Sequence, residues 1–339
     1  MAHSTRESLV CQFQREHQAL KSSPGLPFRD LLDEKRVLRA LQCAQVAFRD
    51  RVYSPMVTIW AALSQVLCGK FSSCRDAVSR ILADRVAQGK KACSTDTSGY
   101  CNARGRLSEQ VLVALTREIG QELHGQALPE WRWKDRPVTL ADGSTATMDD
   151  TEANQEAYPQ SRNQKKGLGF PLLRFVVLIS LSVGTVLDCA LGACRGKKTG
   201  EQSLFRQMEN TLKPGDILLA DRLYDCYRDI VSLKSRGVDV VIGMKQSRRC
   251  DFRRGRRLGW GDHVVTWQKP RYDASRYESR AQWEALPDEI EMREVRVTVC
   301  RPGHRTRVIA VVTTLLDAEQ YSPQDLTDLF AERWHCELD

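Results

Sequence analysis

Hydrophobic and polar positions divide the chain into two parts. Over residues 28–123, apolar side chains recur at spacings close to the 3.6-residue helical repeat. Residues 76–87, within this range, have the pattern of an amphipathic helix. A polar stretch that contains glycine, residues 88–106, separates that segment from another helical pattern over residues 108–123. The first third of the chain is therefore predicted to be helical.

After Pro129 the pattern changes to short apolar runs, which predict strands. A turn or bulge is expected at Asp142-Gly143, between the first two runs. Helical patterns cover residues 201–212 and 227–235, and another begins with Ser322-Pro-Gln-Asp325, where Pro suits a first helical turn. The predicted strands are residues 138–141, 144–148, 172–181, 184–192, 216–220, 239–244 and 308–315. This second part predicts an α/β fold.

The composition excludes some classes of protein but does not identify the function. The chain has 339 residues, 42% of them hydrophobic, which is enough for one large domain or two to three smaller ones. Its 12 cysteines are scattered and form no Cys-x-x-Cys pair, which argues against a disulfide framework. No secretory signal opens the sequence, and the longest apolar stretch, residues 170–186, is interrupted by polar residues. We expect a cytoplasmic protein.

The charge distribution favours a polyanionic partner. The formal net charge is +8, which is compatible with such a partner but does not establish one. Arginines are concentrated in one segment, with Asp251 as the opposing acid; they are Arg248, Arg249, Arg253, Arg254, Arg256 and Arg257. A solvated loop and a segment that contacts phosphates both remain open interpretations.

Three carboxylates stand in contexts that suit metal chemistry. Asp142 and Asp221 each follow an apolar strand-like run, and Glu337 shares a helical pattern with Phe330 and Arg333. Acids that are distant in sequence can converge on divalent cations, because hard cations such as Mg²⁺ take oxygen ligands. Plain structural interpretations also exist, since Asp-Gly is an ordinary turn pair and an Arg four residues before a Glu is an ordinary helix pair.

These residues resemble the motifs of DDE transposases of bacterial insertion sequences, specifically the IS-four family. Around its third acid that family carries Tyr-x-x-Arg-x-x-x-Glu and a distal Lys. Phe330, Arg333 and Glu337 fit this motif, with Phe in place of Tyr. The Lys would fall beyond the last residue, so the resemblance implies a chain truncated after the catalytic Glu. At the other acids, Asp142-Gly-Ser-Thr fits well, whereas Asp221-Arg-Leu-Tyr has Leu in place of a small residue.

The resemblance implies a DNA transposase. Asp142, Asp221 and Glu337 would hold two Mg²⁺ ions, for which Mn²⁺ can substitute. Water would cut the transposon end, and the freed 3′-hydroxyl would attack target DNA by direct transesterification. The implied partners are double-stranded DNA, at the inverted repeats and the target, and a second copy of the chain, which would form a homodimer on DNA. The implied location is the bacterial cytoplasm, at the nucleoid.

The same resemblance implies an α/β fold with an RNase H-like core, a mixed sheet in which three antiparallel strands precede parallel crossovers. Residues 131–245 and 306–339 would form this core. Residues 246–305 would form a β-rich insertion before the last helix. Residues 1–130 would be a helical N-terminal region that either binds DNA ends or packs as a cap.

DNA contacts are expected beside the acids and in the insertion. Arg333 suits a phosphate, because its planar guanidinium can donate two parallel hydrogen bonds. The other candidates for DNA contact are Arg222, Tyr224, Phe330, Arg248, Arg249, Arg253 and Arg254. Three tryptophans of the insertion, Trp260, Trp267 and Trp283, can stack on an extruded base, although packing inside a small β-domain explains them as well.

Two other functions remain open on the sequence alone. A helix that ends soon after Glu337 would fray and hold that side chain poorly, so the chain could be a non-catalytic remnant that only binds DNA ends. A host RNase H-like nuclease is the other alternative. The long stretch between Asp221 and Glu337 argues against it.

Overall fold

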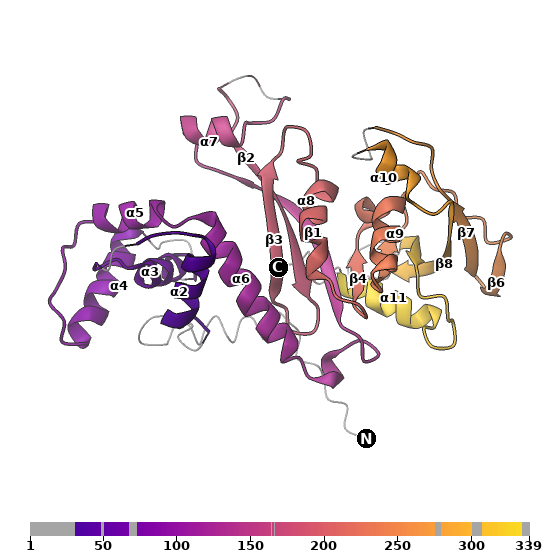
Figure 1. Cartoon of the computed structure of the whole chain (residues 1–339), viewed down its shortest axis with the longest axis horizontal. Coiled ribbons are helices and arrows are strands. Elements are labelled where there is room, and N and C mark those ends of the chain that lie inside the picture. The colour runs from indigo at the N-terminus through magenta and orange to yellow at the C-terminus, as the bar shows by residue number, and fades with distance from the viewer. Residues whose placement is uncertain are drawn as a thin grey trace. The chain divides into compact units, whose positions relative to one another are not determined.

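The computed structural model of the protein describes residues 31–48, 51–67, 73–163, 165, 167–274, 279–299 and 307–333. The chain divides into two compact units, Met1–Ile119 and Gly120–Asp339. Each unit has buried hydrophobic clusters of its own. Figure 1 labels most of the helices and strands of both units.

The described part of the first unit is helical. Two buried clusters hold its helices together, one around Leu41, Trp60 and Leu115 and the other around Ile81 and Tyr100. The helices are α2 (Glu34–Cys43), α3 (Pro55–Leu67), α4 (Cys74–Ala87), α5 (Ser98–Gly105) and α6 (Glu109–Gly125), the last of which continues into the second unit.

Helix α5 lies inside the stretch that the sequence pattern reads only as a polar separator, so that prediction is wrong over residues 98–105. Tyr100 is fully buried there, and its ring centroid is 6.0 Å from that of Tyr53. The short helix forms because it packs against α3 and α4, which a local pattern of polar residues does not reveal.

The second unit is built on one nine-stranded mixed sheet, so the α/β prediction is confirmed. Its strand order is β3-β2-β1-β4-β5-β9-β8-β7-β6. The pairs β1–β4 and β4–β5 are parallel, and all other neighbours are antiparallel. The strands are β1 (Val138–Thr147), β2 (Leu172–Ser180), β3 (Val186–Ala193), β4 (Ile217–Ala220), β5 (Asp239–Gly243), β6 (Arg256–Gly259), β7 (Asp262–Gln268), β8 (Glu289–Val299) and β9 (Arg307–Thr313).

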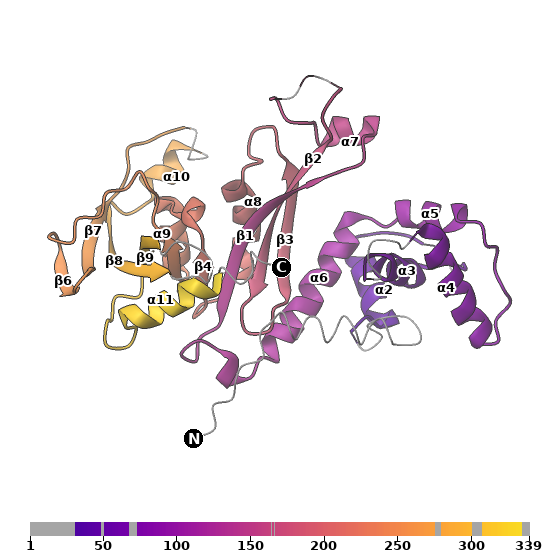
Figure 2. The ribbon, with the colours of Figure 1, turned by 180° about the vertical axis from the view of Figure 1, so that it is seen from behind.

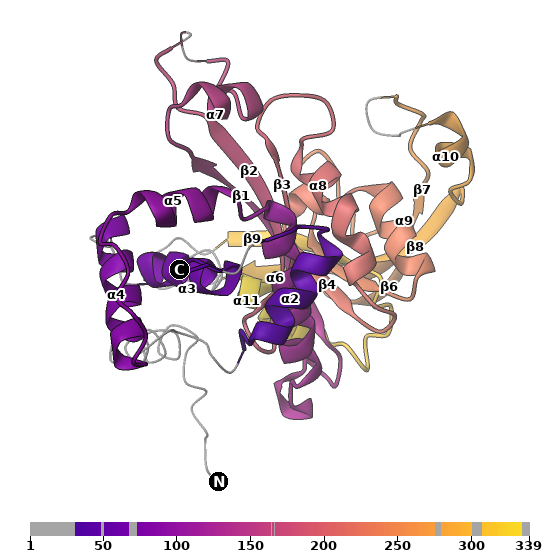
Figure 3. The same cartoon turned by 60° about the vertical axis from the view of Figure 1, so that its left-hand side comes forward.

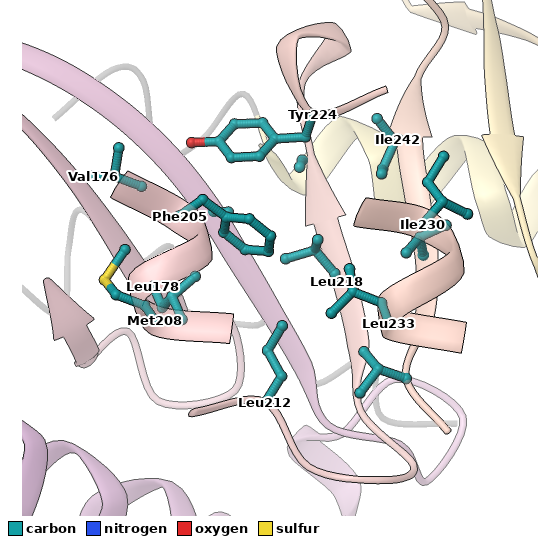
Figure 4. Packing of buried hydrophobic residues seen from close by; sticks show 14 of the residues in the cluster. Val176, Leu178, Phe205, Met208, Leu212, Leu218, Tyr224, Ile230, Leu233 and Ile242 are labelled. Atoms are coloured by element: carbon teal, nitrogen blue, oxygen red, sulfur yellow. The ribbon is translucent and has the colours of Figure 1, made fainter. Parts of the chain in front are cut away.

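Helices cover both faces of this sheet. On one face, α8 (Glu201–Met208) packs on β2 and β3, and α9 (Tyr227–Ser235) packs on β5 (Figure 3). Figure 4 shows the core beneath them, with Phe205 and Met208 from α8 and Leu233 from α9 directed toward the strands. On the other face, α11 (Pro323–Glu332) lies against β5 and β8 (Figure 2).

Local sequence explains where α11 begins. Ser322 accepts a hydrogen bond from the backbone N–H of Asp325, and the Asp325 carboxylate accepts one in return from the backbone N–H of Ser322. This capping box satisfies two backbone donors at the helix start, and Pro323 occupies the first turn as predicted. Shorter helices of the second unit are η1 (Pro129–Trp131), α7 (Glu152–Ala157), η2 (Glu209–Thr211), η3 (Arg222–Tyr224) and α10 (Arg280–Glu284).

The structure corrects one strand prediction. No turn or bulge interrupts the chain at Asp142-Gly143, because β1 runs unbroken from Val138 to Thr147 and pairs with β2 without a register shift. Antiparallel pairing with β2 overrides the turn preference of Asp-Gly. Asp142 therefore lies within a strand instead of after one.

Among the described residues, no helix combines the length and the apolar character that a membrane crossing requires.

Candidate active site

Asp142 and Asp221 occupy neighbouring positions on adjacent parallel strands. β1 pairs with β4 up to Ala141↔Ala220, and each aspartate is the next residue of its chain segment. Since neighbouring strands lie about 4.8 Å apart, this register brings the first and second predicted acids side by side. Both side chains are partly exposed, so a substrate can reach them.

The alternation of side chains places both acids on the face of the sheet that α11 covers. Leu140 and Leu219 belong to the buried cluster beneath α11, and the alanine after each belongs to the cluster on the opposite face. Successive side chains of a strand point to opposite faces. The aspartates that follow those alanines are therefore on the α11 side.

A local hydrogen bond fixes the second acid. Asp221 is the N-terminal cap of η3, and its Oδ1 accepts a hydrogen bond from the backbone N–H of Leu223 at 2.7 Å. The short helix thus begins at the point where β4 ends. This contact leaves the other carboxylate oxygen of Asp221 for a ligand.

Helix α11 carries Phe330 and Arg333 to the same region. Gly243 lies between Phe330 and η3, because a Cβ built on it would be 3.3 Å from Phe330 Cζ and 3.3 Å from the backbone N of Arg222. Phe330 and Arg333 are both buried, and the Arg333 guanidinium carbon lies 5.6 Å from the centre of the Phe330 ring. Glu337 lies outside the described residues, so its place beside the aspartates stays a prediction.

A further acid, Glu201, which the sequence analysis does not single out, lies against Gly143, the residue after Asp142. A Cβ built on Gly143 would be 2.7 Å from the Glu201 carboxyl carbon, so this carboxyl group lies over the β1 backbone. Burial raises the pKa of Glu201; Arg174 opposes that rise, and the negative charges of Asp221 and Asp142 add to it. No sequence signal marks Glu201, because only the packing of α8 brings it to β1.

Tyr224 forms the buried side of this cluster. Its ring meets that of Phe205 edge-on at 5.4 Å between centroids (Figure 4). Its hydroxyl group is buried without a hydrogen-bond partner among the described residues. Burial is the main cause that raises the pKa of Tyr224, and Glu201, Asp142 and Asp221 contribute. A DNA contact by Tyr224 stays a prediction.

Comparison with known proteins decides the family. Residues 133–339, more than half of the chain, match the family described as "Transposase DDE domain". The chain belongs to the DDE transposases. It is therefore a DNA transposase, an enzyme that breaks and joins phosphodiester bonds. The comparison favours neither the host nuclease nor the non-catalytic remnant.

One curated relative narrows this assignment. The transposase InsG for insertion sequence element IS4, from Escherichia coli (strain K12), is 24% identical to the chain over 323 residues. The similarity covers 93% of the chain and 67% of the relative. Together with the family match, it identifies a DDE transposase of the IS4 family, as the sequence motifs predict.

The transposase presents its predicted arginines in two ways. Arg248 is anchored, since its guanidinium lies 3.2 Å from Asp225 Oδ1 and its carbon atom lies 3.5 Å from the centre of the Trp267 ring. Arg253 and Arg254 are exposed, and both form ion pairs with Asp251. Arg222 and Arg249 are exposed as well. Of the six arginines predicted to contact DNA, the structure thus leaves these four exposed to a polyanion, while Arg248 is anchored and Arg333 is buried.

A cavity of about 760 Å³ lies between α8 and the segment that follows η3. Its lining includes Glu201, Leu223 and three basic residues, Arg174, Lys245 and Arg248. Acidic and basic side chains thus line one cavity, which includes Leu223, two residues after Asp221. Such a cavity can accept a phosphate while the acids nearby hold cations.

The three tryptophans of the predicted insertion lie in different environments. Trp267 is buried and donates a hydrogen bond to Glu294 Oε1 at 2.9 Å. Trp283 donates one to the carbonyl of Pro270 at 2.8 Å. Trp260 is 77% exposed, with the Arg296 guanidinium 5.0 Å from its ring centre. Of the three, Trp260 is the most accessible to a base.

Proposed function

We propose that Asp142 and Asp221 are two of the acids with which this transposase cuts DNA at the ends of its insertion sequence and joins them to target DNA. The observation that carries this proposal is the register Ala141↔Ala220, which sets two carboxylates from distant parts of the chain at adjacent positions. Glu337 is proposed as the third acid on its motif alone.

We propose an RNase H-like core for residues 131–245 and 306–339. The strand order β3-β2-β1-β4-β5 supports it, with antiparallel pairing first and parallel pairing after β1. Residues 246–305 are proposed as the insertion; their described strands extend the same sheet beyond β9. Residues 1–130 are proposed to bind DNA ends or to pack as a cap.

DDE transposases use divalent metal ions, and the donors present here fit such ions. Both neighbouring acids offer carboxylate oxygens, which are the ligands that Mg²⁺ prefers. We propose two Mg²⁺ ions, with Mn²⁺ as a substitute, held by Asp142, Asp221 and Glu337. When bound, they supply Lewis acidity that activates the attacking oxygen and stabilises charge on the leaving oxygen.

The chain itself positions the DNA. Arg333 is proposed to orient a phosphate oxygen, and Arg222, Arg249, Arg253 and Arg254 to hold the backbone through charge, without sequence choice. In the first step a water oxygen bonds to phosphorus and the 3′-oxygen leaves with a proton. In the second, the freed 3′-hydroxyl loses its proton as its oxygen bonds to a target phosphorus, and the 3′-oxygen of the target strand leaves from that phosphorus with a proton. Holding the two reacting groups in place lowers the entropy cost of each step.

Two copies of the chain are proposed to act together as a homodimer on DNA, since joining two transposon ends to one target requires both ends at once. The location proposed for this reaction is the nucleoid of a bacterial cytoplasm.

Cleavage of DNA that carries the inverted repeats tests the assignment of the acids. Asp142→Asn and Asp221→Asn should each lower the Mg²⁺-dependent rate by about 10³-fold or more, which corresponds to several kcal/mol of transition-state stabilisation. DNA affinity should remain. Asp149→Asn is the matched control, because Asp149 is an exposed acid in the loop after β1. Cutting at the wild-type rate by Asp142→Asn would refute the assignment.

A further inference from the structure

A second cluster of potential metal ligands lies in the strands beyond β9, apart from the aspartate pair. His263 on β7 and Glu294 on β8 are directly opposite each other in the antiparallel register, and both are buried. Cys250, in the loop before β6, completes the group. One ligand atom from each residue lies within 4.8 Å of the others.

The contacts of His263 place both of its ring nitrogens opposite oxygen acceptors. Nδ1 lies 2.7 Å from the carbonyl oxygen of Arg254, which can only accept, so Nδ1 carries a hydrogen. In a neutral ring Nε2 then has a lone pair. That lone pair faces Glu294 Oε2 at 2.9 Å, and the other Glu294 oxygen already accepts from Trp267. Either a second proton or a cation must lie between Nε2 and the carboxylate.

The third donor favours a metal ion over a proton. Cys250 Sγ lies 3.8 Å from the same Nε2 atom. Tetrahedral zinc with ordinary bond lengths places nitrogen and oxygen ligands about 3.4 Å apart and sulfur and nitrogen ligands about 3.6 Å apart. The observed distances of 2.9 Å and 3.8 Å differ from these by about half an ångström or less. Cys250 Sγ and the Glu294 oxygen lie within 4.8 Å of each other, so side-chain shifts of about an ångström would bring all three donors to zinc bonding distances.

Hydrogen bonds with neighbouring residues orient His263 and Glu294, as hydrogen bonds around a metal site usually orient its ligands. Ligating histidines usually donate their other ring N–H to a backbone carbonyl, as His263 does to Arg254. Trp267 orients the Glu294 carboxylate in the same way. The three ligands also line a cavity of about 620 Å³, which leaves space for a water molecule as the fourth ligand.

We propose that Cys250, His263 and Glu294 bind a zinc ion. A mixed set of thiolate, imidazole and carboxylate suits zinc better than Mg²⁺, which takes oxygen ligands. The ion would tie the arginine-containing loop at Cys250 to β7 and β8, and so hold Arg248, Arg249 and their neighbours in place. This proposal does not depend on the assignment of the catalytic acids.

Metal content and cobalt spectra of the full-length chain test the proposal. After equilibration with equimolar zinc and removal of free metal, the wild type should retain about one zinc per chain. Cobalt in its place should show the absorption band of a thiolate ligand. Cys250→Ser and Glu294→Gln should weaken zinc binding at least about tenfold and Cys250→Ser should remove the thiolate band. Cys194→Ser, a partly exposed thiol outside the cluster, should change neither.

A measurement on the wild type tests the proposal even if the variants misfold. Zinc should slow the alkylation of Cys250 relative to Cys194 in the same molecule, as followed by mass spectrometry of the labelled peptides. A wild type that retains no zinc, or equal labelling of Cys250 with and without zinc, would overturn the proposal and leave a proton shared between His263 and Glu294.

Discussion

At the residue scale, the contact between Gly143 and Glu201 gives the most specific expectation. A Cβ on Gly143 would meet the Glu201 carboxyl group at 2.7 Å, so Gly143→Ala should displace that carboxyl group from its place over β1. Displacement of a group near the reacting atoms by about an ångström should lower the cleavage rate roughly tenfold to a hundredfold. Cleavage kinetics with saturating DNA would measure the loss.

Gly200→Ala is the matched control for this substitution. Gly200 precedes α8, and a Cβ built on it meets nothing within 4 Å. Its stability should change by no more than about 1 kcal/mol, and its cleavage rate should not fall. Equal rates for both alanine variants would show that Glu201 plays no part in the site.

A substitution of Tyr224 can distinguish a role in packing from a role in DNA binding. Its buried hydroxyl group has no hydrogen-bond partner among the described residues, and an unsatisfied buried hydroxyl destabilises a fold by about 1–3 kcal/mol. Tyr224→Phe should therefore keep or raise the midpoint of urea unfolding and leave DNA affinity unchanged. A drop in affinity without loss of stability would instead support the predicted DNA contact.

At the element scale, two matched capping boxes separate helix stability from function. Ser322 caps α11 and Ser73 caps α4, each with an Asp three residues later. Replacement of either serine by alanine should cost about 1 kcal/mol of unfolding free energy. Only Ser322→Ala should also reduce cleavage, because α11 carries Phe330 and Arg333. Equal cleavage by the two variants would argue against a role for α11 in positioning.

Some helices and strands can be predicted from the sequence, and others depend on contacts between distant residues. Strands β4 and β5 follow from their apolar runs, because both of their faces are buried. Helix α9 follows from apolar residues at helical spacing, because one of its faces packs on the sheet. The unbroken β1 was not predictable at Asp142-Gly143, because its pairing with β2 is not a local property. Glu201 was missed for a related reason, since α8 brings it to β1 only in the folded chain.

A buried ion pair between β8 and β7 should contribute strongly to stability. Arg293 is fully buried, donates two hydrogen bonds to the Asp262 carboxylate at 2.8 Å and 2.7 Å, and donates another to the carbonyl of Tyr321 at 2.7 Å. Arg293→Met would leave Asp262 buried without a counter-charge and should cost about 3–5 kcal/mol of unfolding free energy. Urea unfolding followed by tryptophan fluorescence would measure it.

The double variant Arg293→Met/Asp262→Leu should recover part of this loss, because no unpaired charge remains buried. Arg253→Met breaks an exposed ion pair with Asp251 and should leave the unfolding midpoint unchanged. A small effect of Arg293→Met would mean that water reaches the pair.

At the scale of the whole molecule, the sequence motifs identify the family, and the fold shows how the strands are arranged around the acids. The three acid motifs predict the family, and the match over residues 133–339 confirms it. The motifs alone do not show that the strands of residues 256–299 continue the same sheet as the aspartates. Paired strands therefore connect the arginine-containing segment to the strands that carry Asp142 and Asp221. A substitution that shifts one of these strands can alter the position of both groups of residues.

The two compact units should respond separately to such a change. The buried clusters of the first unit use residues from Leu32 to Leu115, and those of the second use residues from Val138 to Phe330. Arg293→Met removes contacts of the second unit alone. Hydrogen exchange followed by mass spectrometry should therefore show faster exchange in β7, β8 and α11, while α3 and α4 keep their protection. Faster exchange in all of these elements would show that the units unfold as one cooperative body.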